Sequence, residues 1–171
     1  MKISPEIKII KSLEDMDILD IKAINLIRND LKVMTKLNVE QVSKESLKKT
    51  KLWLTYKIQK AIYFFGVYLN DELIGFFNID NQKFGDGIIP GVEVGFALKS
   101  SCWGRGFGKD TLRKVIIFLR KTSCKFIVAR VLSSNNSSIR LFENLDFNEA
   151  GRFNKIDLRK GDDLVFLIKY L

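Results

Sequence analysis

The 171-residue chain contains no histidine, and this absence removes several classes of functional site at once. Zinc sites with histidine ligands, nucleophiles activated by histidine and histidine general bases are all excluded. Only two cysteines occur, Cys102 and Cys124, which are too few for a disulfide scaffold. We therefore expect free thiols and no metal site. Only 2 prolines and 11 glycines are present, which excludes collagen-like and proline-rich chains.

Long apolar runs are also lacking. The longest are short, such as 115–119, far below the roughly 20 residues of a membrane span. Residues 1–10 alternate charged and apolar side chains and lack the apolar segment of a signal peptide. The sequence therefore indicates a cytoplasmic protein that makes no use of a membrane.

The remaining composition is that of a globular protein, with 46% hydrophobic and 29% charged residues. No repeat or linker divides the chain, so we expect a single domain over 1–171. Lys and Arg (29) outnumber Asp and Glu (20), and a net charge of +9 attracts anionic partners. A solvated lysine-rich surface is the simpler explanation. Nucleic-acid binding is not expected, because the lysines of 44–51 lack interleaved aromatic residues.

Hydrophobic periodicity predicts an α+β fold, a mixed sheet with helices. Helices are predicted over 12–29, 43–58, 107–121 and 136–144. Strands are predicted over 7–11, 61–69, 73–79, 92–98, 126–132, 147–154 and 164–170. Residues 70–72 have the chemistry of a hairpin turn, and the breakers in 80–90 and 159–162 predict a loop and a turn.

The predicted strand 92–98 has two different faces. Bulky apolar side chains define a face for the core: Val92, Val94, Phe96 and Leu98. The other face carries only Glu93, Gly95 and Ala97. A strand face with so few side chains lets a ligand approach the backbone.

The segment 102–109 carries the clearest chemical signal. It reads Cys-Trp-Gly-Arg-Gly-Phe-Gly-Lys and joins this strand to an amphipathic helix. Glycines free the backbone for close approach, and the first N–H groups of a helix attract anions. Arg105 and Lys109 add positive charge. The segment predicts a phosphate site, with a tight structural turn as the alternative. The dinucleotide fingerprint requires G-x-G-x-x-G, whereas the glycines here are Gly104, Gly106 and Gly108. A P-loop requires Ser or Thr after its lysine, but Asp110 follows Lys109.

Several motifs together resemble the GNAT superfamily of acyl-CoA-dependent N-acetyltransferases. They are Glu93-Val94-Gly95-Phe96, the Trp-Gly-Arg-Gly-Phe-Gly run of 103–108, Asn135-x-x-Ser138-Ile139-Arg140 and Leu145-Asp146-Phe147. The Trp-Gly-Arg-Gly-Phe-Gly form is most similar to the ribosomal-protein N-terminal acetyltransferase branch, the RimJ/RimL type. Ile27-Arg28-Asn29-Asp30 and Trp53-Leu54 are similar to that branch as well. The resemblance covers about 7–170.

The resemblance implies a mostly antiparallel twisted sheet of about seven strands flanked by about four helices. It also implies acetyl-CoA as donor and an amine as acceptor. The family's pyrophosphate loop falls on Trp103, Gly104, Arg105, Gly106, Phe107 and Gly108, with Lys109 beside it. Phe96, Ala97 and Leu98 would pair with the pantetheine arm, and Asn135 would lie near that arm.

This sequence departs from the family pattern at three positions. Trp103 stands where the superfamily usually has Gln or Arg, as is common in the RimJ/RimL branch. Asp146 replaces the usual glycine before Phe147, which is expected to alter the turn. Phe142 replaces the tyrosine that many members use as a general acid, and it has no proton to donate.

Acetyl transfer to an ammonium requires a base, an oxyanion donor and a proton for the leaving thiolate. Glu93, on the bare strand face, is the candidate base, and a backbone N–H of the same strand is the candidate oxyanion donor. Ser138 is the candidate acid. Simpler alternatives are an ion pair for Glu93 and helix capping for Ser138. Cys102 and Cys124 are expected to pack rather than to carry an acyl group.

The sequence therefore predicts an enzyme that moves an acetyl group from acetyl-CoA to a primary amine by direct transfer. The acceptor is a protein N-terminus, an amino sugar or another small amine. Two other hypotheses stay open. A non-catalytic acyl-CoA sensor would keep the loop without working acid and base groups, and a basic nucleic-acid-binding domain would bind with a steep salt dependence.

Overall fold

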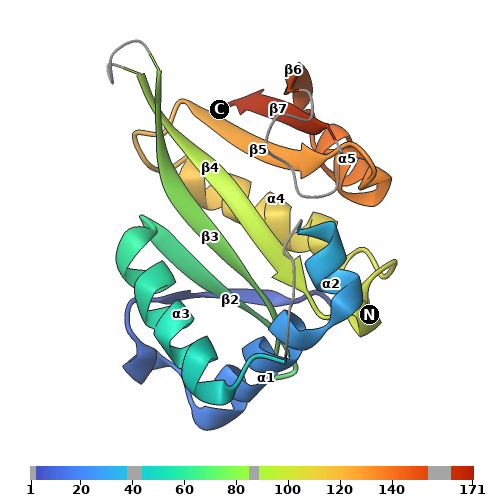
Figure 1. The fold of residues 1–171 in the computed structure, drawn as a ribbon. Helices are drawn as coiled ribbons and strands as arrows, with labels where there is room; N and C mark the ends of the chain where they lie inside the picture. Colours follow the sequence, from blue (N-terminus) through green and yellow to red (C-terminus); the bar gives the residue numbers. More distant parts are fainter. Residues whose placement is uncertain (1–2, 38–43, 85–88, 154–162) are drawn as a thin grey trace.

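The structure is a computed structural model that describes residues 3–37, 44–84, 89–153 and 163–171. Within these ranges, seven strands form one sheet with helices on both sides (Figure 1). The strands are β1 (Glu6–Ile10), β2 (Tyr63–Leu69), β3 (Glu72–Phe84), β4 (Ile89–Leu98), β5 (Phe126–Leu132), β6 (Asn148–Phe153) and β7 (Leu164–Tyr170). The α-helices are α1 (Ile18–Asn29), α2 (Leu31–Lys36), α3 (Leu47–Lys60), α4 (Phe107–Leu119) and α5 (Asn136–Glu143). The predicted α+β class is confirmed.

The sheet has the order β1-β2-β3-β4-β5-β7-β6, and only β4 and β5 run parallel to each other. Their pairing is short, from Gly91 with Phe126 to Glu93 with Val128. Beyond Glu93 the two strands diverge (Figure 1), while β4 continues to pair with β3 as far as Leu98. The divergence leaves the last five residues of β4 with a strand partner on one edge only, among the described residues.

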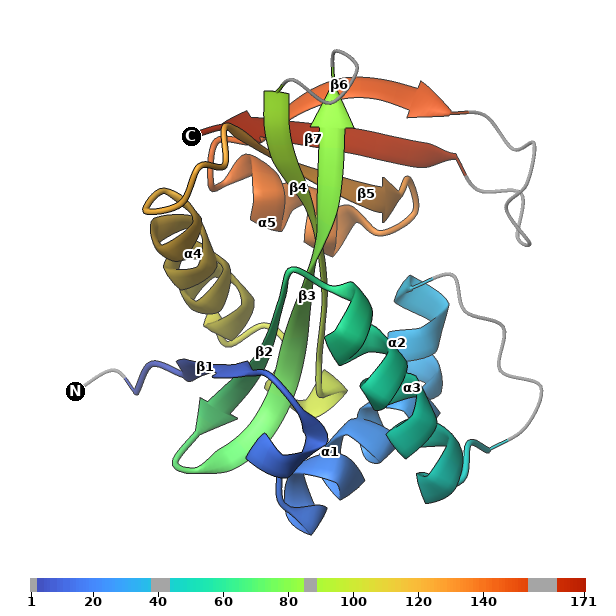
Figure 2. The ribbon, with the colours of Figure 1, turned by 90° about the vertical axis from the view of Figure 1, so that its left-hand side faces the viewer.

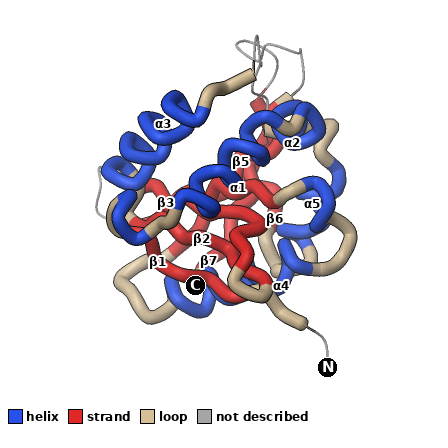
Figure 3. Tube along the Cα trace, turned by 90° about the horizontal axis from the view of Figure 1, so that it is seen from below, coloured by secondary structure: helices blue, strands red, loops and turns tan. Residues whose placement is uncertain are grey.

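Two hydrophobic clusters cover opposite faces of the sheet. One contains buried side chains of α4 and α5, such as Leu112 and Phe142. The other contains buried side chains of α1, α2 and α3, such as Ile24 and Leu54. Figures 2 and 3 show α4 on one side of the sheet and α1 and α3 on the other. The amphipathic stripe predicted for the helix after Phe107 is therefore confirmed as a core face.

Two predicted boundaries are wrong. The predicted loop over 80–90 is mostly strand, because β3 extends to Phe84 and β4 begins at Ile89 and pairs with it. Cross-strand pairing outweighs the breaker signal of Pro90, whereas Gly85 and Gly87 lie outside the described residues. The single helix predicted over 12–29 is a short 3-10 turn (Leu13–Asp15) followed by α1. The structure describes five α-helices where about four were expected, because Asp30 ends α1 and caps α2.

The β2–β3 hairpin turns where predicted. Asn70 and Asp71 both have positive φ, 50° and 62°, which is the geometry of a two-residue hairpin turn. The turn predicted over 159–162 and Ser43, the predicted start of the second helix, lie outside the described residues. Within the described ranges, every helix is too short or too polar for a bilayer-spanning segment.

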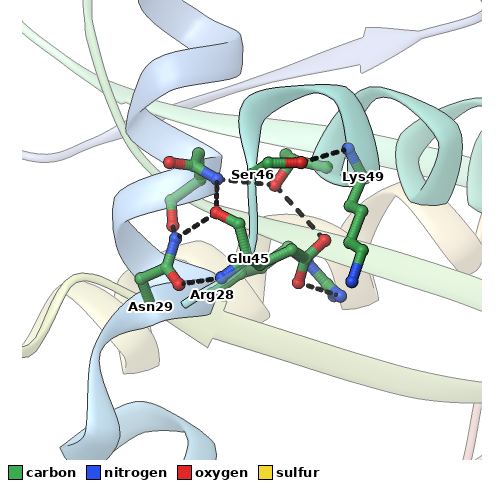
Figure 4. Close-up of polar contacts among 7 residues, drawn as sticks. Arg28, Asn29, Glu45, Ser46 and Lys49 are labelled. Carbon is green, nitrogen blue, oxygen red and sulfur yellow. Dashed lines mark hydrogen bonds and ion pairs between the residues drawn. The ribbon is translucent and has the colours of Figure 1, made fainter. Parts of the chain in front are cut away.

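A polar network joins α1 to the start of α3 (Figure 4). Nε and Nη2 of Arg28 donate to Oε2 of Glu45 at 2.9 and 2.7 Å. The Glu45 main chain also donates to Asn29 Oδ1 (2.6 Å) and accepts from Asn25 Nδ2 (2.9 Å). Asn25 Nδ2 further contacts the buried Thr50 hydroxyl at 2.9 Å. These bonds fix the two helices against each other.

Candidate functional site

A groove of about 480 Å³ lies between the end of β4, the start of α4, α5 and α2. The predicted cofactor-binding residues that line it are Phe96, Ala97, Leu98, Trp103, Gly104, Gly106, Phe107, Gly108, Lys109 and Asn135. The candidate acid Ser138 also lines it. Arg105 does not; its guanidinium lies over the ring of Phe107, 4.8 Å from the centroid. The structure thus brings together residues that lie up to about forty positions apart in the sequence.

One wall of the groove is the unpaired edge of β4. The N–H of Lys99 donates to the Ile74 main-chain oxygen in β3 at 2.8 Å. Because successive residues of a strand alternate in direction, the main-chain groups of Leu98 and Phe96 point to the opposite edge. The oxygen of Leu98 there accepts from Trp103 Nε1 at 3.0 Å. The N–H and oxygen of Phe96 therefore face the groove.

The other end of the groove is the start of α4. Gly106 caps this helix with a positive φ of 83°, and Gly104 before it has a φ of 72°. The first intrahelical bond is from Asp110 N–H to the Gly106 oxygen at 3.0 Å. The N–H groups of 107–109 precede this bond, and no side chain caps them. Three N–H donors at the positive end of a helix form an anion site.

Basic side chains also line the groove. Lys109 belongs to the first turn of α4, Arg140 comes from α5 and Lys36 from α2, and all three line the groove. Sequence reasoning identified Lys109 as part of the site and missed the other two. The sequence signal for α2, the helix that carries Lys36, is its N-cap residue Asp30. The Asp30 side chain accepts from Lys32 N–H at 2.9 Å and caps the start of α2.

Asp30 also fixes α2 to the loop before Trp103. Burial alone would raise the pKa of Asp30, but hydrogen bonds from the Ser100 hydroxyl and from two backbone N–H groups of α2 hold it below its usual value. The carboxylate form of Asp30 is thereby favoured in the folded protein. It links α2, on one side of the groove, to the loop on the other.

A second cavity of about 120 Å³ lies where β4 and β5 diverge. Gly95 from β4 and Arg130 from β5 form its sides. Lys36, Phe96 and Ser138 line both cavities, so the two spaces adjoin. The unpaired edge of β4 thus borders the larger groove and the smaller cavity together.

The comparison with known proteins decides which family this arrangement belongs to. Residues 11–148 match the family described as Acetyltransferase (GNAT) domain. The chain belongs to the GNAT acetyltransferase family. The uncharacterized N-acetyltransferase p20 of Bacillus licheniformis is 31% identical over 94 residues. The match covers 53% of this chain and about half, 50%, of that curated relative.

Two solved structures show that this fold is that of GNAT proteins. The ribosomal-protein-alanine N-acetyltransferase of Brucella melitensis is similar with a TM-score of 0.76 and 21% identity, over 97% of this chain and 99% of that one. The yncA protein of Salmonella typhimurium, solved with its cofactor acetyl-CoA, is similar with a TM-score of 0.75 and 20% identity. That match covers 98% of this chain and 94% of the other. The predicted GNAT-like sheet with flanking helices is confirmed.

Two of the three departures from the GNAT pattern have a structural explanation. Asp146, at the position of the family's glycine, keeps a positive φ of 61°, so the turn before Phe147 is retained. Phe142, at the position of the family's tyrosine, is 2% exposed and packs edge-on against Phe96 and Phe147. Its ring is part of the core beneath the smaller cavity.

Asn135 is buried and holds two elements of this GNAT site together. Its Oδ1 accepts from the hydroxyl of Ser137 (2.9 Å) and from the N–H of Ser138 (3.3 Å), which caps α5. Its Nδ2 donates to the main-chain oxygen of Lys36 at 3.4 Å, at the end of α2. Asn135 therefore joins α5 to α2 across the groove.

Glu93, the candidate base, is engaged by two neighbours. Arg130 Nε donates to its Oε1 at 2.6 Å and Gln82 Nε2 to its Oε2 at 3.1 Å. The Glu93 side chain is 16% exposed, and Glu93 lines neither cavity. It lies on the same face of β4 as Gly95 and next to the smaller cavity through Arg130. This ion pair is the simpler role expected for Glu93, and it joins two residues that lie 37 positions apart in the sequence.

The two cysteines differ in position. Cys102 is buried and lines the groove. Burial raises the pKa of the Cys124 thiol, which donates to the Phe126 oxygen at 3.1 Å. A protonated, hydrogen-bonded thiol is a poor nucleophile. Within the described residues, no three His, Cys, Asp or Glu side chains lie close enough to hold a metal ion.

Proposed function

We propose that this GNAT protein is an N-acetyltransferase that transfers an acetyl group from acetyl-CoA to a primary amine by direct transfer. The observation that supports this most strongly is one groove with two features: the unpaired backbone edge at Phe96 and the uncapped N–H groups of 107–109. An extended amide-bearing arm suits the first, and a pyrophosphate suits the second. Acetyl-CoA carries both groups.

In this proposal, the backbone N–H groups of 107–109 hold the pyrophosphate, and Lys109 and Arg140 add charge. Phe96 offers its N–H and oxygen to the pantetheine arm. The Leu98 oxygen is already used by Trp103, so Leu98 would contribute its N–H. Bound acetyl-CoA supplies the activated acetyl group as a thioester. The solved Salmonella relative, which has acetyl-CoA as cofactor, supports this donor.

We infer that Glu93 takes the proton of the acceptor ammonium, directly or through water. Because Glu93 lines neither cavity, the route through water is favoured. A backbone N–H on the free edge of β4, at Val94 or Phe96, would hold the developing oxyanion. Ser138 lies one helical turn before Phe142 and lines both cavities. Its hydroxyl is our candidate donor to the leaving sulfur.

The acceptor is either a protein N-terminus or a small amine such as an amino sugar. The similarity to the Brucella ribosomal-protein-alanine N-acetyltransferase and the Trp-Gly-Arg-Gly-Phe-Gly motif support the RimJ/RimL-like branch. A net charge of +9 disfavours polycationic acceptors such as polyamines.

Thiol release from acetyl-CoA in the presence of a panel of amines tests the proposal. We expect amine-dependent release, and we expect Glu93→Gln to lower kcat at least tenfold with little change in acetyl-CoA affinity. An unchanged kcat would remove Glu93 from the mechanism. Tight binding of acetyl-CoA without release from any amine would favour the sensor, for which the buried Phe142 in place of a tyrosine is the supporting observation.

A further inference from the structure

We propose that the amine acceptor carries an anionic group, a carboxylate or a phosphate near its nitrogen, and that Arg130 and Lys36 bind this group. The inference rests on the proposed function, because it concerns the acceptor of the same acetyl transfer. Its starting point is the small cavity between the diverging ends of β4 and β5. This cavity adjoins the groove at Phe96 and Ser138, where the acetyl group is expected.

The charged residues that line the cavity are both basic, and the carboxylate paired with one of them, Glu93, does not line it. Lys36 and Arg130 both line it, and none of its described lining residues is an Asp or a Glu. An acceptor with a second cationic group would meet two like charges, whereas an anionic group would be attracted by both. The volume of about 120 Å³ admits a small polar head group rather than a bulky ring system.

Arg130 is held in position to bind an anion. Its Nε donates to Glu93 at 2.6 Å, and Gln82 holds the other oxygen of that carboxylate. The contact occupies one edge of the guanidinium and leaves the two Nη groups unused by Glu93. The Arg130 side chain is 48% exposed, so an acceptor can reach these groups. Paired N–H donors in one plane fit a carboxylate or a phosphate.

The positions of Glu93 and Arg130 also determine where the anionic group of the acceptor would lie relative to its reacting nitrogen. Glu93 is the last residue of β4 that pairs with β5, opposite Val128. Arg130 lies two residues beyond Val128 on β5, where the strands separate. A small acceptor whose anionic group contacts Arg130 can extend its amine toward the Phe96 edge. Arg130 would thus select the acceptor and orient it, while Glu93 fixes Arg130.

Two matched pairs of amines test the inference in the thiol-release assay: glycine with glycinamide, and O-phosphoethanolamine with ethanolamine. We expect kcat/KM to be at least tenfold higher for the anionic member of a pair. The pair with the larger ratio shows whether the group is a carboxylate or a phosphate. Equal values within both pairs overturn the inference, as does release from uncharged amines alone. An absence of release from all four, with acetyl-CoA bound, also overturns it.

Variants of Arg130 provide the residue-level test. Arg130→Gln should bring the ratio of anionic to uncharged acceptor toward one, with the acetyl-CoA Kd within twofold of wild type. Arg130→Lys keeps the charge without the planar fork and should give an intermediate ratio. Lys121→Gln removes the same charge just after α4 and should leave the ratio unchanged. A ratio unaffected by Arg130→Gln overturns the inference.

The two proposals fail in different ways. If wild-type protein does not bind acetyl-CoA, the proposed function is wrong and this inference falls with it. If acetyl-CoA binds and amines are acetylated without preference for the anionic members, only this inference is wrong.

Discussion

Asn135 donates a hydrogen bond from Nδ2 to the main-chain oxygen of Lys36, a residue 99 positions earlier in the chain. The same side chain caps α5 through Oδ1. One buried amide therefore connects the C-terminal end of α2 to the N-terminal end of α5, and the groove lies between these two ends. The shape of the groove depends on this connection as well as on the loop before α4.

Replacing Asn135 separates its two roles. Asn135→Ser retains a capping oxygen and lacks the donor to Lys36, whereas Asn135→Ala lacks both. We expect the alanine variant to lose about 1 kcal/mol more unfolding free energy than the serine variant. Both should bind acetyl-CoA several-fold more weakly, because both lose the link to α2. Urea unfolding and calorimetry measure the two effects, and wild-type affinity in the serine variant would show that the link is not needed.

Trp103→Phe tests the contact that closes the free edge of β4. The phenyl ring keeps most of the apolar area and removes the indole donor to the Leu98 oxygen. We expect a loss of about 1 kcal/mol of stability and a several-fold higher acetyl-CoA Kd, because the loop is no longer fixed to the strand end. Trp53→Phe is the control for the loss of ring area: Trp53 packs against Phe76 and Arg28, does not line the groove, and its replacement should leave the Kd unchanged. Equal Kd values for the two variants would contradict this role.

Asp30 gives a pH-dependent prediction. Because its pKa is lowered in the folded state, its contribution to stability is fully present above the ordinary aspartate value of 3.8 and is lost as the pH falls through the folded-state pKa. Asp30→Ala should therefore cost about 1 kcal/mol at pH 7, as for loss of a helix cap, and less below about pH 4. The difference in urea midpoint between variant and wild type measures it. A difference that grows on acidification would contradict the assignment.

Much of the fold was predictable because local patterns and tertiary pairing agree. The strands predicted over 126–132 and 164–170 coincide with β5 and β7, and the apolar stripe located α4 from Phe107. The loop predicted over 80–90 is too long because the signal of Pro90 is local, whereas the β3–β4 pairing of the described residues 80–84 and 89–90 is not. The end of α1 at Asn29 was predicted, but the separate helix α2, which begins at Leu31, was not.

The candidate site was predictable where it is contiguous in sequence. The segment 103–109 and the strand end 96–98 come from one stretch, and all of these residues except Arg105 line the groove. Two contacts join distant segments, Arg130 with Glu93 and Asn135 with Lys36, and spacing in the sequence does not predict them. At Asp146 the sequence predicted a change that the structure does not show. The aspartate was expected to alter the turn, but it adopts the positive φ that the turn requires.

Calorimetric titration with acetyl-CoA tests the central claim, a donor site formed by the β4 edge and the start of α4. Wild type and Gly151→Val should bind in the micromolar range, because Gly151 lies in β6, away from the groove, and a Cβ added there meets no other atom within 4 Å. Gly106→Val should bind at least tenfold more weakly, since a β-branched residue strains a φ of 83° and crowds the N–H groups of 107–109. ATP serves as the control ligand, and circular dichroism checks that the variants fold. No binding by wild type, or equal binding by Gly106→Val, would contradict the account.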